Sequence, residues 1–230
     1  MGGADAETDQ RMPLSRVVLK VIALDFDGTL VESNHIKDHA FETIFSDWPD
    51  HRGAMMKWHL ARNGVERREK FRYFVEKVLD RQGDEELIEK LTAKFSRLTR
   101  EAIINCSLVD GAMEFLKYFH GNIPLFLISA TPQNELNKVL KKRCLDGYFE
   151  KAYGAPINKV HILNEIMTDQ KASPDEVLYI GDSPEDQQAA VSLGVHFIGR
   201  MSDRVLGKGN TPAFPELNKV RHYAINQYAL

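Results

Sequence analysis

The chain has 230 residues and a net charge of −3, with 43% hydrophobic and 27% charged residues. This composition is typical of a soluble globular protein, and the length allows one large domain or one domain with an insertion. Nucleic-acid surfaces are usually basic, and a membrane span needs roughly 20 apolar residues in a row. Since the sequence has neither feature, we expect no nucleic-acid partner and no membrane partner.

The N-terminal segment and the two cysteines bear on the cellular compartment of the protein. Residues 1–16 are polar and partly acidic, unlike a secretory signal peptide, so we predict a disordered tail there. Cys106 and Cys144 have the spacing of neither a disulfide framework nor a metal site. Two free thiols favour a reducing compartment, and the predicted location is cytoplasmic.

The first apolar run, residues 17–24, ends in the sequence Asp25-Phe26-Asp27-Gly28-Thr29. In an extended chain, residues two apart face the same side, so both carboxylates point to one spot at the end of a buried strand. Open α/β sheets bind their ligands at that end. Two carboxylates this close repel each other unless a cation or a shared proton intervenes, so the pair predicts an active site.

Residues 35–105 show helical spacing only. Aromatic and aliphatic residues recur on one face of three successive segments, and breaks are expected at Asn63-Gly64 and at 82–84, where Asp84 begins a helix. We therefore predict a small helical bundle inserted just after the carboxylate pair, where it can act as a lid.

From residue 110 onward, strands and helices alternate. The predicted strands are 123–129, 148–153, 177–180 and 195–198, and the predicted helices are 112–119, 132–142 (with Thr131 as N-cap), 156–167 and 184–193. Residues 199–230 are ambiguous, with a terminal helix as one option. The fold class is α/β: a Rossmann-like parallel sheet with helices on both faces plus an inserted all-helical cap domain. The core domain comprises 17–33 and 107–230, and the cap domain 34–106.

Other polar residues also follow predicted strands. Ser129 ends one strand, Asp182 ends another and precedes Asp186, and Lys159 follows a Gly-Ala-Pro turn. Right-handed crossovers make these strands parallel, so their ends share one edge of the sheet.

These motifs, in this order, resemble those of the haloacid dehalogenase superfamily over about residues 17–200. Within it, the capped phosphatases similar to phosphoglycolate phosphatase and β-phosphoglucomutase match best. The sequences that carry the resemblance are Asp25-Phe26-Asp27-Gly28-Thr29, Ser129, Lys159 and Gly181-Asp182-Ser183-Pro184-Glu185-Asp186.

The resemblance implies a Mg²⁺-dependent phosphatase that acts on a small phosphate ester, such as phosphoglycolate or a sugar phosphate. Asp25 would be the nucleophile and Asp27 the acid and base, which requires an Asp27 pKa above that of free aspartate. The implied Mg²⁺ ligands are the Asp25 and Asp182 carboxylates and the Asp27 carbonyl, with Asp186 orienting Asp182 or a metal-bound water. Ser129 and Lys159 would bind the phosphoryl oxygens.

Each of these residues also has a plain structural interpretation. Asp186 stands at a capping-box position after Ser183, Ser129 can be a simple strand-end hydroxyl, and Lys159 can be a surface lysine. Asn34, His35 and Lys37 lie where the chain leaves for the cap, and some are expected near the leaving group. Most basic residues of the cap are expected in solvent, with Arg62 and Lys57 as candidates for contact with a substrate anion.

Several functions stay open at this point. A phosphomutase would return the phosphoryl group to a sugar, and a phosphonate-cleaving enzyme would need a lysine in the lid. A dehalogenase has no use for the acid Asp27. A non-catalytic binding module is disfavoured by the intact motifs. The sequence makes no prediction of oligomeric state.

Overall fold

The computed structural model describes residues 16–62, 64–156, 158–207 and 210–229. Its centre is a six-stranded parallel sheet in the order β3-β2-β1-β4-β5-β6. The strands are β1 Val21–Leu24, β2 Leu125–Pro132, β3 Lys151–Ala155, β4 Val177–Gly181, β5 His196–Arg200 and β6 Ala213–Phe214. The predicted α/β class is confirmed. The predicted tail lies outside the described residues, apart from residue 16.

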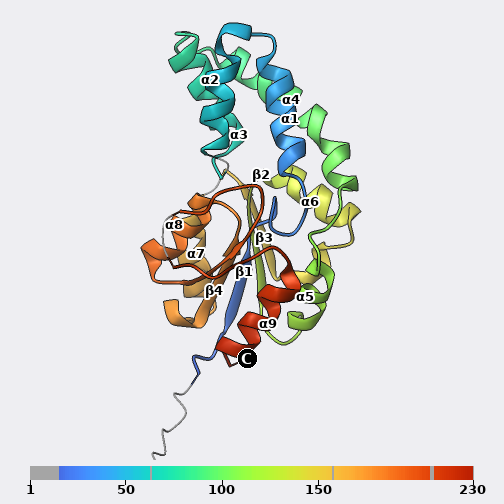
Figure 1. Cartoon of the computed structure of the whole chain (residues 1–230), viewed down its shortest axis with the longest axis vertical. Coiled ribbons are helices and arrows are strands. Elements are labelled where there is room, and N and C mark those ends of the chain that lie inside the picture. Colours follow the sequence, from blue (N-terminus) through green and yellow to red (C-terminus); the bar gives the residue numbers. More distant parts are fainter. Residues whose placement is uncertain (1–15, 63, 157, 208–209, 230) are drawn as a thin grey trace, which may run out of the picture.

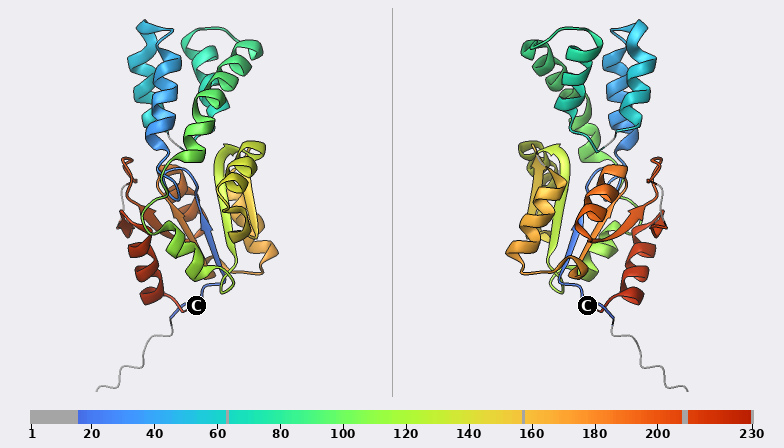
Figure 2. Two further views of the ribbon diagram at one scale, coloured as in Figure 1. Left: turned by 90° about the vertical axis from the view of Figure 1, so that its right-hand side faces the viewer. Right: turned by 90° about the vertical axis from the view of Figure 1, so that its left-hand side faces the viewer.

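Helices cover both faces of this sheet (Figures 1 and 2). Side chains alternate along β1, so Ile22 and Leu24 face one layer while Val21 and Ala23 face the other. The first layer holds α5 Ala112–Phe119, α6 Gln133–Lys142 and α9 Leu217–Gln227, and the second holds α7 Lys159–Asp169 and α8 Pro184–Leu193. All four β1 side chains are fully buried, which explains why this strand reads as a continuous apolar run.

The remaining helices form a separate group above the carboxyl ends of the strands, which we call the cap (Figure 1). It consists of α1 Asn34–Phe45, α2 Pro49–Leu60, α3 Arg67–Tyr73, a π-helical turn Phe74–Val78 and α4 Glu85–Asn105. Its own core is rich in phenylalanine, with Phe41, Phe45, Phe71, Phe74 and Phe95 almost completely buried. Asp84 caps α4 by accepting a hydrogen bond from the Leu87 N–H at 3.0 Å, as expected. The proposed domain limits at residues 34 and 106 stay a prediction.

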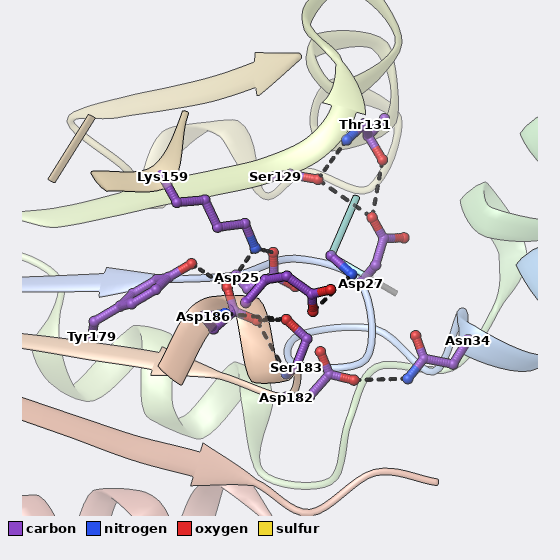
Figure 3. Close-up of polar contacts among 12 residues, drawn as sticks. Asp25, Asp27, Asn34, Ser129, Thr131, Lys159, Tyr179, Asp182, Ser183 and Asp186 are labelled. Carbon is purple, nitrogen blue, oxygen red and sulfur yellow. Dashed lines mark hydrogen bonds and ion pairs between the residues drawn. The ribbon is translucent and has the colours of Figure 1, made fainter. Parts of the chain in front are cut away.

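One local prediction is wrong, and one short strand was not predicted. Thr131 is not a helix N-cap, because β2 continues to Pro132 and α6 begins at Gln133. The pairing of β2 with β3 is irregular between Ile128 and Pro132, and Ser129 and Thr131 of this stretch donate to Asp27 (Figure 3). The short strand β6 was not predicted, because two residues give no alternating pattern; the optional terminal helix is present as α9.

Among the described residues, no helix has both the length and the apolar character that crossing a membrane requires.

Candidate active site

Three predicted acids converge where the strand order reverses, between β1 and β4. Asp25 follows β1, Asp182 follows β4, and Asp186 lies in the first turn of α8. Each offers a carboxylate oxygen, and the three oxygens lie within 4.8 Å of one another (Figure 3). All three residues are at least 95% buried. Such a cluster of buried oxygens is the donor set that a hard divalent cation prefers.

The loop after β1 packs directly against Asp182. Gly28 has a φ of +79°, and a Cβ there would stand 2.1 Å from Asp182 Oδ2. Only glycine fits this position, because the backbone is left-handed and the carboxylate occupies the side-chain space. Asn34 at the start of α1 donates to the same oxygen at 2.8 Å, so the cap also contacts this carboxylate.

Lys159, the first residue of α7, lies between two of the acids. Its Nζ donates to Asp25 Oδ1 at 3.0 Å and to Asp186 Oδ1 (Figure 3). Asp186 also accepts hydrogen bonds from the Tyr179 hydroxyl and from the Ser183 N–H and hydroxyl. The predicted capping box is present, and the same carboxylate anchors the lysine. The capping-box interpretation of Asp186 is confirmed, whereas its expected role in orienting Asp182 or a metal-bound water stays a prediction.

Asp27 is surrounded by donors on both carboxylate oxygens. Oδ1 accepts from Ser33 at 2.7 Å, while Oδ2 accepts from Thr131 at 2.9 Å and Ser129 at 3.3 Å and forms an ion pair with Lys37 at 2.5 Å. Burial acts to raise the pKa of Asp27, but Lys37 and the hydrogen bonds outweigh burial and hold that pKa below its usual value. The expected elevated pKa is wrong for this state, because the reach of Lys37 from α1 was not foreseen.

The pKa values of Asp25 and Asp182 are shifted in the opposite direction. Burial raises the pKa of Asp25 well above its usual value, against the attraction of Lys159 and with further elevation from Asp186, Asp182 and Asp27. Burial and the neighbouring Asp186 raise the pKa of Asp182 to about 6. Negative charge is therefore crowded at this point, which is the electrostatic condition that a divalent cation relieves.

A cavity of about 50 Å³ lies between this floor and the cap, with room for only a few water molecules. The lining on the cap side includes Lys37, Asp38, Phe41, His59, Arg67, Lys70 and Phe95. Arg62 and Lys57, the predicted candidates for anion contact, are exposed and do not line it. The cap side chains that do reach the cavity include Arg67 and Lys70, which are 5% and 2% exposed.

Some residues of the site had no signal in the sequence. Arg204 comes from the loop after β5 and meets Asp38 of α1, and Ser33 donates to Asp27. His35 of the α1 start is exposed, whereas Lys37 and Asn34 point into the site. These contacts depend on how the cap helices are rotated over the sheet, which residue spacing within one helix does not determine.

The sheet has helices on both faces, and buried carboxylates and a lysine meet where its strand order reverses, beneath a helical cap. This arrangement defines a class of capped α/β enzymes. Within this class the chain belongs to the haloacid dehalogenase-like hydrolase family, whose model matches residues 22–200.

Among known proteins, a phosphoglycolate phosphatase of Photobacterium profundum is 26% identical over 201 residues, which cover 79% of this chain and 82% of that protein. The crystal structure of a predicted phosphoglycolate phosphatase from Haemophilus somnus is 18% identical, with a TM-score of 0.69 over 90% of this chain and 98% of that one. The hydrolase YfnB of Bacillus subtilis, whose structure is bound to magnesium, is 18% identical, with a TM-score of 0.65 over 90% and 98% of the two chains. The structural likenesses establish the fold.

Proposed function

We propose that this protein is a Mg²⁺-dependent phosphomonoester hydrolase that acts on a small phosphorylated metabolite through an aspartyl-phosphate on Asp25. One observation carries the proposal: Asp25, Asp182 and Asp186 converge within 4.8 Å at the carboxyl edge of the sheet, beside Lys159. Family membership and the phosphoglycolate phosphatase relative support the same reaction class.

In the first half-reaction, an Asp25 carboxylate oxygen forms a bond to phosphorus and the bond from phosphorus to the ester oxygen breaks. Lys159 fixes Asp25 through Oδ1, so the nucleophile is held in one orientation. Ser129 and Lys159 would bind the phosphoryl oxygens. The Ser129 hydroxyl lies next to Asp27 at 3.3 Å and is fully buried, so an oxygen bound there would be shielded from water.

Asp27 carries the proton in both half-reactions. It gives a proton to the leaving alkoxide, and then takes one from the water that attacks phosphorus and releases Asp25. Lys37 holds the pKa of Asp27 low and so favours its carboxylate form, which suits the second of these roles. For the first role Asp27 must first take up a proton from solvent, so we infer that the substrate's phosphoryl group draws Lys37 away when it binds and lets the Asp27 pKa rise.

The carboxylate cluster fits a magnesium ion. Asp25 and Asp182 would hold it with the Asp27 carbonyl, while Asp186 would stay outside the ligand set, because its oxygens already accept from Lys159, Tyr179 and Ser183. When bound, Mg²⁺ supplies positive charge that lets an anionic nucleophile approach an anionic phosphoryl group.

The volume of the cavity limits the size of the substrate. This volume of about 50 Å³ is small, so the cap has to move to admit a substrate and encloses only a short leaving group when it closes. This supports a small phosphate ester as the reaction partner. The predicted cytoplasmic location stays a prediction.

A panel of phosphate esters, assayed with Mg²⁺ and again with excess EDTA, tests the proposal. We expect Mg²⁺-dependent release of inorganic phosphate, and no turnover of any ester would refute it. With a sugar monophosphate, product analysis separates hydrolysis from the alternative phosphomutase reaction: a hydrolase yields free sugar and phosphate, and a mutase yields an isomeric sugar phosphate.

A further inference from the structure

The cap side of the cavity contains a lysine at an unusual depth. Lys70 of α3 lines the cavity and is 2% exposed, and so is His59 of α2 beside it. Lysine is rarely buried this deeply, because removing an ammonium from water is costly. No step of the proposed reaction uses Lys70.

A chain of hydrogen bonds fixes the position of this ammonium. Lys70 Nζ lies 3.0 Å from His59 Nδ1, and His59 Nε2 lies 2.8 Å from Asp38 Oδ1, which also accepts from Arg204. Burial lowers the pKa of His59 to about 4, so the imidazole is neutral near pH 7. Since Nε2–H donates to the Asp38 carboxylate, Nδ1 is the acceptor and Lys70 is the donor. The ammonium is thus held by a chain that runs from α3 through α2 and α1 to the loop after β5.

Arg67, the arginine of the cap that lines the cavity, makes a different set of contacts. Arg67 donates to Glu135 of α6 at 2.9 Å and to Ser96 of α4 at 2.8 Å, and Ser96 in turn donates to Glu135 at 2.7 Å. These contacts join the cap to the sheet domain. Arg67 therefore serves cap closure, and Lys70 is the better candidate for contact with a substrate.

Positive charge gathers on this side of the cavity. Lys37 and Arg204 line it together with Lys70 and come from two other elements. Burial first, and then Lys37 and Arg204, lower the pKa of Lys70 to about 7, while Glu185 and Asp38 act in the opposite direction. An anionic group placed here would favour the ammonium form and reduce the repulsion among these cations.

We propose that Lys70 binds a second oxyanion on the leaving group, so that the preferred substrates are short phosphate esters that also carry a carboxylate or a second phosphate. This inference rests on the proposed function and names its substrate class. The small cavity favours the smaller group, a carboxylate on a short carbon chain.

Three esters of similar size test the inference: phosphoglycolate, 2-hydroxyethyl phosphate and ethanediol bisphosphate. We expect kcat/KM for phosphoglycolate to exceed that for 2-hydroxyethyl phosphate by about 10- to 100-fold, the range of one hydrogen bond to a charged group. A still higher kcat/KM for the bisphosphate would identify phosphate as the second oxyanion, and a lower one would identify carboxylate.

We define the selectivity ratio as kcat/KM for phosphoglycolate divided by kcat/KM for 2-hydroxyethyl phosphate. In the variant Lys70→Met the two kcat/KM values should differ by no more than about threefold. The matched control Lys57→Met removes an exposed cap lysine and should leave the ratio as in the wild type. If Lys70→Met does not fold, the variant His59→Gln tests the inference instead. It keeps the Lys70 ammonium but replaces the imidazole that accepts its hydrogen bond. The selectivity ratio should fall at least threefold, which is roughly the effect of one hydrogen bond.

An unchanged ratio in a folded Lys70→Met variant would overturn the inference and leave the proposed function intact. So would a wild-type enzyme that hydrolyses 2-hydroxyethyl phosphate as well as both anionic esters. No turnover of any of the three esters would overturn the proposed function together with the inference.

Discussion

The neutral state of His59 has a consequence for stability that can be measured without a substrate. In the unfolded chain this imidazole titrates with a pKa of about 6.5, whereas burial lowers the pKa to about 4 in the folded protein. Between these values the unfolded state binds the extra proton, so the free energy of unfolding falls as the pH falls. The contribution of His59 is present in full above pH 6.5, and is lost progressively down to about pH 4.

The two pKa values fix the size of the effect. Relative to pH 8, linkage gives a loss of about 2 kcal/mol at pH 5 and a limit of about 3 kcal/mol below pH 4. The variant His59→Gln keeps a side-chain N–H that can donate to Asp38 but has no group that titrates in this range. Its free energy of unfolding should therefore fall by about 2 kcal/mol less than that of the wild type between pH 8 and pH 5.

Urea denaturation at pH 8, 6.5 and 5 measures this difference, since the slope with denaturant gives the free energy of unfolding at each pH. His39→Gln, which changes an exposed histidine of α1, is the matched control and should follow the wild type. If the His59→Gln and wild-type curves run parallel across this range, His59 is not a buried neutral histidine. The hydrogen-bond direction inferred for Lys70 would then be wrong as well.

Two further predictions concern the reacting groups. Asp182→Asn removes one anionic oxygen from the carboxylate cluster and should raise the Mg²⁺ concentration needed for half-maximal activity by at least about 10-fold; an unchanged Mg²⁺ titration would remove Asp182 from the ligand set. Lys37→Met removes the cation that holds the Asp27 pKa down, so the basic limb of the kcat/KM profile, where the free enzyme loses the Asp27 proton that the leaving group needs, should move to higher pH. A basic limb at the same pH in both enzymes would show that Asp27 does not govern it.

The parts of the site that could be predicted are those set by local sequence and by sheet topology. Asp25 and Asp182 each end an apolar run, and parallel strands place such ends at one edge whatever the details of packing. Asp186 was visible as the third residue of a helix opened by Ser183 and Pro184. The order of these motifs was enough to indicate the family and the α/β fold.

The parts that could not be predicted depend on contacts between distant elements. Thr131 next to Pro132 has the pattern of a helix start, but the strand continues through both residues and the Thr131 hydroxyl donates to Asp27. Lys70 is indistinguishable in sequence from exposed cap lysines such as Lys57, and the place of Lys37 near the start of the cap did not predict its ion pair with Asp27. The roles of Lys37 and Lys70 follow from the rotation of α1 and α3 above the sheet, which the phenylalanine core of the cap fixes.

The central claim is that Asp25 takes the phosphoryl group covalently. Rapid acid quenching of the wild-type enzyme during turnover, followed by peptide mass spectrometry, tests it most directly. We predict that the peptide containing Asp25 carries one added phosphoryl group, and that Asp25→Asn neither acquires it nor turns over substrate. A phosphoryl group on another residue, or continued turnover by Asp25→Asn, would contradict the account.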